Sequence, residues 1–175
     1  MNLSLINPHI RLAIESRISA GHNIAKRVIY DYELVYFNSG IHAHGQSVEE
    51  YKRNYTAVLR RIRELLPKVP IILGLSTPLT EGNTAEAGTY DTPVSLDETV
   101  RLTEQNKTVV GFNRAVLEIA EEEVLEVFDA YSLMLENTQY KKADGVHFTP
   151  EGYALLSSEI ISKIKNIINT KRITK

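Results

Sequence analysis

Short apolar segments alternate along this chain with longer segments of helical periodicity, and this alternation constrains the fold more than any other feature. Four apolar segments are predicted to be strands, and they cover residues 9–14, 33–37, 69–77 and 124–130. Segments this apolar suit strands that are covered on both faces, as in a parallel sheet. We therefore expect a parallel sheet with helices on both sides.

Three helical patterns lie between or after these strands. One begins at Ser47, where a Ser-x-x-Glu opening is typical of a capping box. A second covers residues 99–122, and a third has Thr149 as its N-cap and Pro150 at its first helical position. Alternating strands and helices predict the α/β class, as a three-layer α/β/α sandwich that binds ligands beyond the carboxyl ends of its strands.

The length of 175 residues predicts a single domain over residues 1–168, followed by a polar C-terminal tail at 169–175. The polar segment 79–98 is predicted to be a long loop.

The overall charge gives no indication of a nucleic-acid or membrane partner, and we expect neither. The net charge is −2, from 20 basic and 22 acidic residues. The N-terminus lacks the pattern of a signal peptide. No other feature of the sequence indicates a compartment, and the localisation stays unknown. Because there is no cysteine, disulfides and thiolate metal sites are excluded.

An acid and a histidine stand just ahead of the last predicted helix, in the segment DGVHFTPEGY. A carboxylate at Asp144 can accept from one imidazole nitrogen of His147 and leave the other nitrogen free as a general base. The alternative is a histidine that is hydrogen-bonded near a helix start for structural reasons only. The spacing by itself leaves both interpretations open.

A second group of polar residues follows the predicted strand 33–37 and comprises Asn38, Gly40, His42 and His44. Small residues and side-chain donors at a strand end can form an anion-stabilising pocket. A metal site that uses His42 and His44 with the Asp–His pair is a second interpretation, and ordinary loop polarity is a third. Gly21, which precedes a helical stretch, is a further candidate site residue, but a single glycine is a weak signal.

Six segments together resemble the SGNH hydrolases, also called GDSL-type esterases and lipases, from about residue 34 to about residue 164. They are VYFNSGIH, EEYKRNYTAVLRRIRELLP, STPLTEGN, FNRAVLEIA, VFDAYSLM and DGVHFTPEGYALLSSEI. The resemblance implies a flavodoxin-like sandwich and a Ser-His-Asp triad that hydrolyses esters of small molecules, without a cofactor or a metal.

Carried over by position, His147 resembles the general base of the family and Asp144 the acid that orients it. Gly21 and His42 resemble the residues that bind the oxyanion, with Asn38 and Gly40 as possible support. His42 stands where the family usually has asparagine, and Ala43 departs from the acid that follows there. A neutral histidine can still donate one hydrogen bond to an oxyanion.

The nucleophile is the part of the triad that the sequence does not identify. In this family it is the serine of a Gly-Asp-Ser turn, and no Gly-Asp-Ser occurs in the chain. Because Met1 lies only twenty residues before Gly21, we expect an N-terminally truncated form with weak or no esterase activity. The pattern around four other serines does not assign any of them as the nucleophile: Ser16, Ser19, Ser39 and Ser76.

Three functions follow from these patterns. The first is an SGNH-type ester hydrolase that acts on a small-molecule ester. The second is a non-catalytic binding or interaction module of the same fold, and the third is a metal-dependent hydrolase. The sequence does not indicate the identity of the acyl group or alcohol, nor the oligomeric state.

Overall fold

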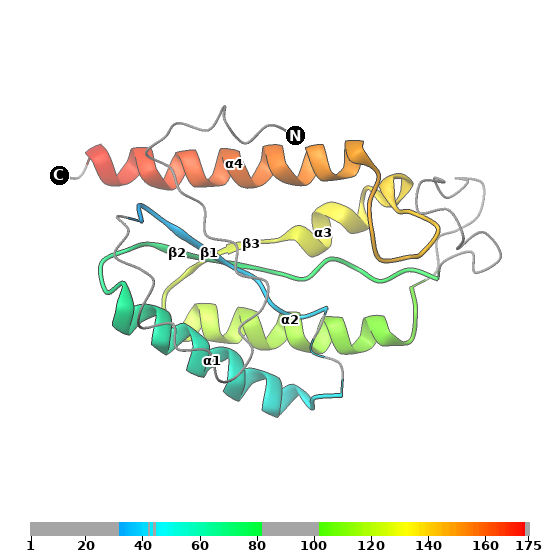
Figure 1. Ribbon diagram of the computed structural model, residues 1–175, viewed down its shortest axis with the longest axis horizontal. Coiled ribbons are helices and arrows are strands. Elements are labelled where there is room, and N and C mark those ends of the chain that lie inside the picture. Colours follow the sequence, from blue (N-terminus) through cyan, green and yellow to red (C-terminus); the bar gives the residue numbers. More distant parts are fainter. Residues whose placement is uncertain (1–31, 42, 44, 82–101, 174–175) are drawn as a thin grey trace.

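A computed structural model describes residues 32–41, 43, 45–81 and 102–173 of the chain (Figure 1). The predicted strand 9–14 and most of the predicted loop 79–98 lie outside the described residues. So do Gly21, His42 and His44 among the candidate site residues.

The centre of the described fold is a parallel three-stranded sheet in the order β1-β2-β3. Its strands are β1 (Val35–Phe37), β2 (Ile71–Gly74) and β3 (Glu126–Phe128). Each lies within a segment that the sequence predicted to be a strand. All residues of β2 are buried, as the uninterrupted apolar run 69–77 indicated.

Helices cover both faces of this sheet (Figure 1). On one face lie α1 (Val48–Leu65) and α2 (Gln105–Glu122), and on the other lies α4 (Pro150–Ile173). Side chains alternate along a strand, so Leu73 joins the core with α1 and α2, whereas Ile72 packs in a second core with Ile164 of α4. The predicted three-layer α/β/α sandwich is confirmed.

Local sequence signals set two of the helix starts. The hydroxyl of Ser47 accepts from the Glu50 N–H at 3.1 Å while the Glu50 carboxylate accepts from the Ser47 N–H at 3.1 Å, which is the predicted capping box. Thr149 Oγ1 likewise accepts from the Gly152 N–H at 3.3 Å at the start of α4. This helix continues to Ile173, into the segment 169–175 that was predicted to be a polar tail.

The prediction for the start of α2 was wrong. The periodicity favoured a helix from residue 99, yet the described helix begins at Gln105, and Glu104 before it makes no side-chain cap. Ahead of it, Leu102 instead forms an isolated antiparallel bridge with Thr80. Pairing with the segment after β2 therefore takes Leu102 out of the predicted helix.

The segments that follow the three strands meet at one end of the sheet (Figure 1). After β3 the chain forms the short helix α3 (Ala130–Leu135) and one 3-10 turn (Thr138–Tyr140), and then a loop that leads into α4. In the ranges that the structure describes, no helix combines the length and the apolar character that crossing a membrane requires.

Candidate active site

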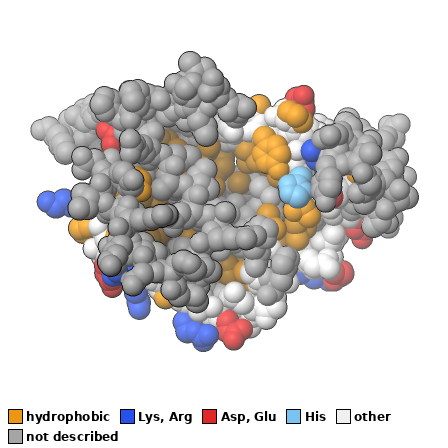
Figure 2. All heavy atoms as spheres, viewed as in Figure 1, with side chains coloured by type: hydrophobic (Ala, Val, Ile, Leu, Met, Phe, Trp, Pro, Cys, Tyr) orange, Lys and Arg blue, Asp and Glu red, His pale blue; other side chains and the backbone are white. Residues whose placement is uncertain are grey.

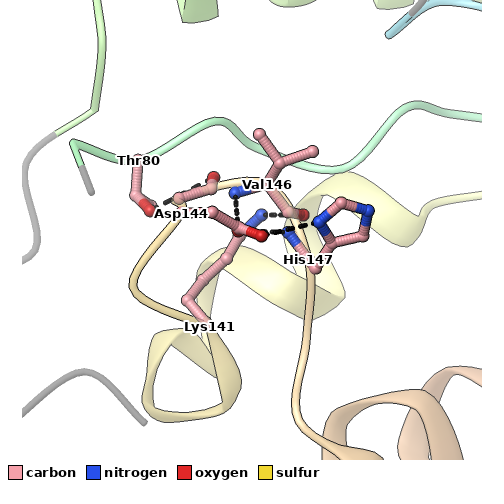
Figure 3. Close-up of polar contacts among 6 residues, drawn as sticks. Thr80, Lys141, Asp144, Val146 and His147 are labelled. Carbon is pink, nitrogen blue, oxygen red and sulfur yellow. Dashed lines mark hydrogen bonds and ion pairs between the residues drawn. The ribbon is translucent and has the colours of Figure 1, made fainter. Parts of the chain in front are cut away.

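The loop between the 3-10 turn and α4 carries Asp144 and His147, and their side chains are hydrogen-bonded to each other. The distance from His147 Nδ1 to Asp144 Oδ2 is 2.7 Å (Figure 3). The other carboxylate oxygen, Oδ1, accepts from the N–H groups of Val146 and His147, each at 2.8 Å. Gly145 has a φ of +70°, a left-handed conformation that favours glycine at this turn. The turn thus wraps the backbone around the carboxylate.

These hydrogen bonds decide the charge of the carboxyl group. Partial burial acts to raise the pKa of Asp144, but the N–H groups of His147 and Val146, together with the imidazole, hold this pKa below its usual value. Asp144 is therefore ionised at neutral pH and can only accept. Since it accepts from Nδ1 of His147, that nitrogen carries the proton of the neutral imidazole and Nε2 has a free lone pair.

The unprotonated nitrogen faces away from the acid that orients the ring (Figure 3). The His147 side chain is 56% exposed, whereas that of Asp144 is 22% exposed. Figure 2 shows a histidine at the surface beside hydrophobic side chains, and His147 is the only histidine within the described ranges. A partly buried orienting acid and an accessible imidazole form an arrangement that can move a proton to or from a bound molecule.

The segment after β2 holds the same loop from the other side. Both the N–H and the hydroxyl of Thr80 donate to the carbonyl oxygen of Gly145, at 3.0 and 3.3 Å (Figure 3). Buried Asn106 of α2 accepts from the Leu79 N–H at 2.9 Å and donates to the Tyr131 hydroxyl at 2.8 Å. Neither Thr80 nor Asn106 was predicted from the sequence to be a site residue. The signal for the second was a polar residue beside the apolar positions of a predicted helix.

Two of the four candidate residues in the loop after β1 are described, and both have structural contacts. Asn38 Nδ2 donates to the Gly74 carbonyl at 2.7 Å, which ties the loop to β2. Gly40 lies so close to Ser76 that a Cβ at this position would overlap Oγ. The Tyr51 hydroxyl donates to the Ser39 carbonyl, and burial raises the pKa of Tyr51, so this donor stays protonated. Residues 38–40 of the loop that the resemblance assigns to oxyanion binding therefore contact β2, the segment after it and α1.

The described serines provide no partner for the imidazole. Ser76 is 3% exposed, and its hydroxyl lies against Gly40 instead of solvent. Ser39 is exposed, but no serine hydroxyl of the described part of the chain is hydrogen-bonded to His147. Ser16 and Ser19 lie outside the described residues.

The predicted metal site is not tested by the structure. Its two histidines of the loop after β1 lie outside the described residues. Within the part of the chain that is described, no group of three or more histidine, aspartate or glutamate side chains has the arrangement of a metal site.

Comparisons with known proteins place this geometry in context. Residues 25–155 match the sequence model of the GDSL-like lipase/acylhydrolase family. A comparison with curated proteins gave no significant match. Among solved structures, the chain is similar to a peptidoglycan O-acetylesterase, with a TM-score of 0.59 and 14% identity over 79% of this chain and 39% of that one.

Two further solved structures are similar. A lipase/acylhydrolase from Enterococcus faecalis has a TM-score of 0.57 and 20% identity, over 77% of this chain and 62% of that one. A GDSL-like lipase from Bacteroides thetaiotaomicron has a TM-score of 0.57 and 18% identity, over 78% of this chain and 63% of that one. The chain thus spans less than two thirds of the length of each of these proteins, and the likeness shows a shared fold.

Proposed function

Since this chain belongs to the GDSL-like lipase/acylhydrolase family, we propose that it forms the acid–base part of an ester hydrolase that acts on small acyl esters. The observation that carries the proposal is the 2.7 Å hydrogen bond between Asp144 and Nδ1 of His147, on an exposed imidazole beyond the ends of the strands. Peptidoglycan, the substrate class named for one structural neighbour, indicates O-acetylated carbohydrate as one class to test.

The proposed reaction is acyl transfer through a serine. The serine oxygen attacks the ester carbonyl carbon while Nε2 of His147 takes the hydroxyl proton. The same proton then passes from Nε2 to the oxygen of the departing alcohol, which leaves an acyl-serine. Water then attacks the acyl-serine while Nε2 takes a proton from it. That proton passes to the serine oxygen, and the carboxylic acid is released. Asp144 stays ionised throughout and stabilises the transient imidazolium.

The oxyanion that forms on the carbonyl carbon needs hydrogen-bond donors that are already in place. By resemblance we assign this role to the Gly21 N–H and to His42, with Asn38 and Gly40 in support. The contacts of Asn38 with Gly74 and of Gly40 with Ser76 support an indirect part for these two residues, since they fix the backbone that leads to His42. Asn38 acts there as a positioning residue.

Hydrolysis of p-nitrophenyl acetate tests the proposal. Because the sequence has no Gly-Asp-Ser, we expect weak or no turnover from the 175-residue chain. A chimaeric protein in which the strand and Gly-Asp-Ser turn of an active family member precede this chain is expected to turn over and to be blocked by a serine-directed phosphonate. In that protein, His147→Ala should lower kcat by about 10³-fold or more.

A matched control is Ser158→Ala, since Ser158 lies on the exposed side of α4 and bonds only within its own helix, to the Leu155 carbonyl. This variant should keep full turnover. If a folded and active chimaera keeps its rate in His147→Ala, the proposed role of the histidine is wrong.

The missing Gly-Asp-Ser favours one other function, a binding module of the same fold. Calorimetric titration with O-acetylated sugars separates the two. Binding without turnover, in the chain and in the chimaera alike, supports the binding module and contradicts the hydrolase.

A further inference from the structure

A lysine is buried beneath the loop that carries the acid–base pair. Lys141 is 0% exposed, although its side chain ends in an ammonium group. Its Nζ donates to the carbonyl oxygen of Val146 at 3.1 Å (Figure 3). The same Nζ lies 4.0 Å from the centre of the Phe148 ring. The backbone closes the loop above it, since the Lys142 N–H donates to the His147 carbonyl at 2.9 Å.

Burial of this cation costs free energy, which indicates that its charge has a role beyond packing. An ammonium loses most of its hydration in such a site and recovers only part of it from one carbonyl and one aromatic face. Burial accordingly lowers the pKa of Lys141 to about 8, although the nearby Asp144 acts in the opposite direction. An unbranched apolar side chain of similar length would fill the same space without that cost.

One peptide unit connects the ammonium to the carboxylate. The Val146 carbonyl and the His147 N–H belong to the same peptide group. Its oxygen accepts from Lys141 Nζ at 3.1 Å, and its N–H donates to Asp144 Oδ1 at 2.8 Å. A cation on the oxygen and an anion on the N–H polarise the peptide in the same direction, so each hydrogen bond strengthens the other.

We propose that Lys141 is a positioning residue for the acid–base pair: through the Val146–His147 peptide, its ammonium fixes the Asp144 carboxylate in the orientation that presents Oδ2 to His147. The inference rests on the proposed function for its significance, because the orientation matters for a histidine that acts as a base. Lys141 itself touches neither the imidazole nitrogen that takes the proton nor the reacting atoms.

Charged or titratable residues lie on both segments next to this ammonium. The loop carries Asp144, His147 and Lys142, and the first turn of α4 carries Glu151 and Tyr153, whose ring is edge-on to Phe148 at 5.8 Å. Of these, Asp144 is the one whose charge acts on the pKa of Lys141. The cation is present at pH 7 and is lost as the pH rises through about 8.

Nuclear magnetic resonance of the 175-residue chain tests the proposal without any turnover. The His147 amide proton should shift with a midpoint near pH 8, as Lys141 loses its charge and the bond to Asp144 weakens. In His147→Gln the amide of residue 147 should keep this transition, which separates it from titration of the imidazole. In Lys141→Met the transition should be absent, and at pH 7 less of the Nδ1–H form of His147 should be present.

Lys165→Met is the matched control, because it removes the same charge from an exposed position of α4. It should leave the amide transition and the imidazole signals unchanged. Equal His147 amide and ring shifts in wild type and Lys141→Met from pH 6 to 10 would overturn the proposal. If Lys141→Met does not fold, a wild-type His147 amide whose shift stays constant from pH 6 to 10 overturns it equally well. Failure of the ester assay would leave these readouts unaffected.

Discussion

Replacement of Asn113 by leucine tests how α2 holds the segment that supports the site. Asn113 is 6% exposed, and its side chain makes both hydrogen bonds of the Ser76 backbone. Oδ1 accepts from the Ser76 N–H at 2.8 Å, and Nδ2 donates to the Ser76 carbonyl at 2.9 Å. Leucine has the same number and branching of side-chain heavy atoms but can make neither bond, so two buried backbone groups lose their partners.

The expected loss of stability follows from those two groups. An unpaired buried donor or acceptor costs about 1–3 kcal/mol, so Asn113→Leu should lower the free energy of unfolding by roughly 2–6 kcal/mol. That is a large part of the stability of a typical domain, which is about 5–15 kcal/mol. Urea unfolding followed by circular dichroism measures the change in midpoint and slope.

Asn54→Leu provides the control on an exposed surface of α1, where the side chain bonds only to the Gln46 side chain at 3.2 Å. It should change the free energy of unfolding by no more than about 0.5 kcal/mol. Equal midpoints for Asn113→Leu and Asn54→Leu would refute the reasoning, since they would mean that the backbone of Ser76 does not depend on α2.

Three further predictions concern the two loops. In the active chimaera, Asp144→Asn should lower kcat by about 10⁴-fold, because an amide that donates to Nδ1 favours the wrong tautomer of His147; a loss below tenfold would contradict an orienting role. Folding lowers the pKa of Asp144, so its contribution to stability is present above the ordinary pKa near 3.9 and is lost as the pH falls through the folded value. Urea midpoints of wild type and Asp144→Asn should therefore differ near pH 6 and converge as the pH falls below the lowered pKa of folded Asp144, and a constant difference would count against this linkage. Gly40→Ala should destabilise the protein by about 1–3 kcal/mol through overlap with Ser76 Oγ, and Ser76→Ala should restore part of the loss if that contact is the cause.

The sequence predicted those features that depend on neighbours along the chain. Apolar runs identified the three described strands, and the Ser-x-x-Glu pattern identified the start of α1. The pairing of Asp144 with His147 also depends on local contacts, since the turn around Gly145 brings them together. Such features follow from spacing because the interacting groups are only a few residues apart.

Contacts between distant segments could not be predicted in the same way. Thr80 reaches Gly145 across 65 positions, and Asn106 reaches Tyr131 across 25. The local pattern does not distinguish Thr80 from a solvent-exposed residue, and for Asn106 it shows only a polar residue beside the apolar positions of a helix. For Lys141 the residue type predicts exposure, because lysine is rarely buried completely, yet its side chain is buried in the structure. The late start of α2 has the same origin, since Leu102 pairs with Thr80 instead of extending the helix.

The imidazole ¹⁵N spectrum of His147 tests the central claim most directly, with His147→Gln to assign the signals. In the wild type at pH 7.5, a proton on Nδ1 and a lone pair on Nε2 are predicted, because ionised Asp144 accepts from Nδ1 at 2.7 Å. A neutral imidazole with its proton on Nε2 would contradict the account, since that nitrogen could not then take the proton of a hydroxyl group.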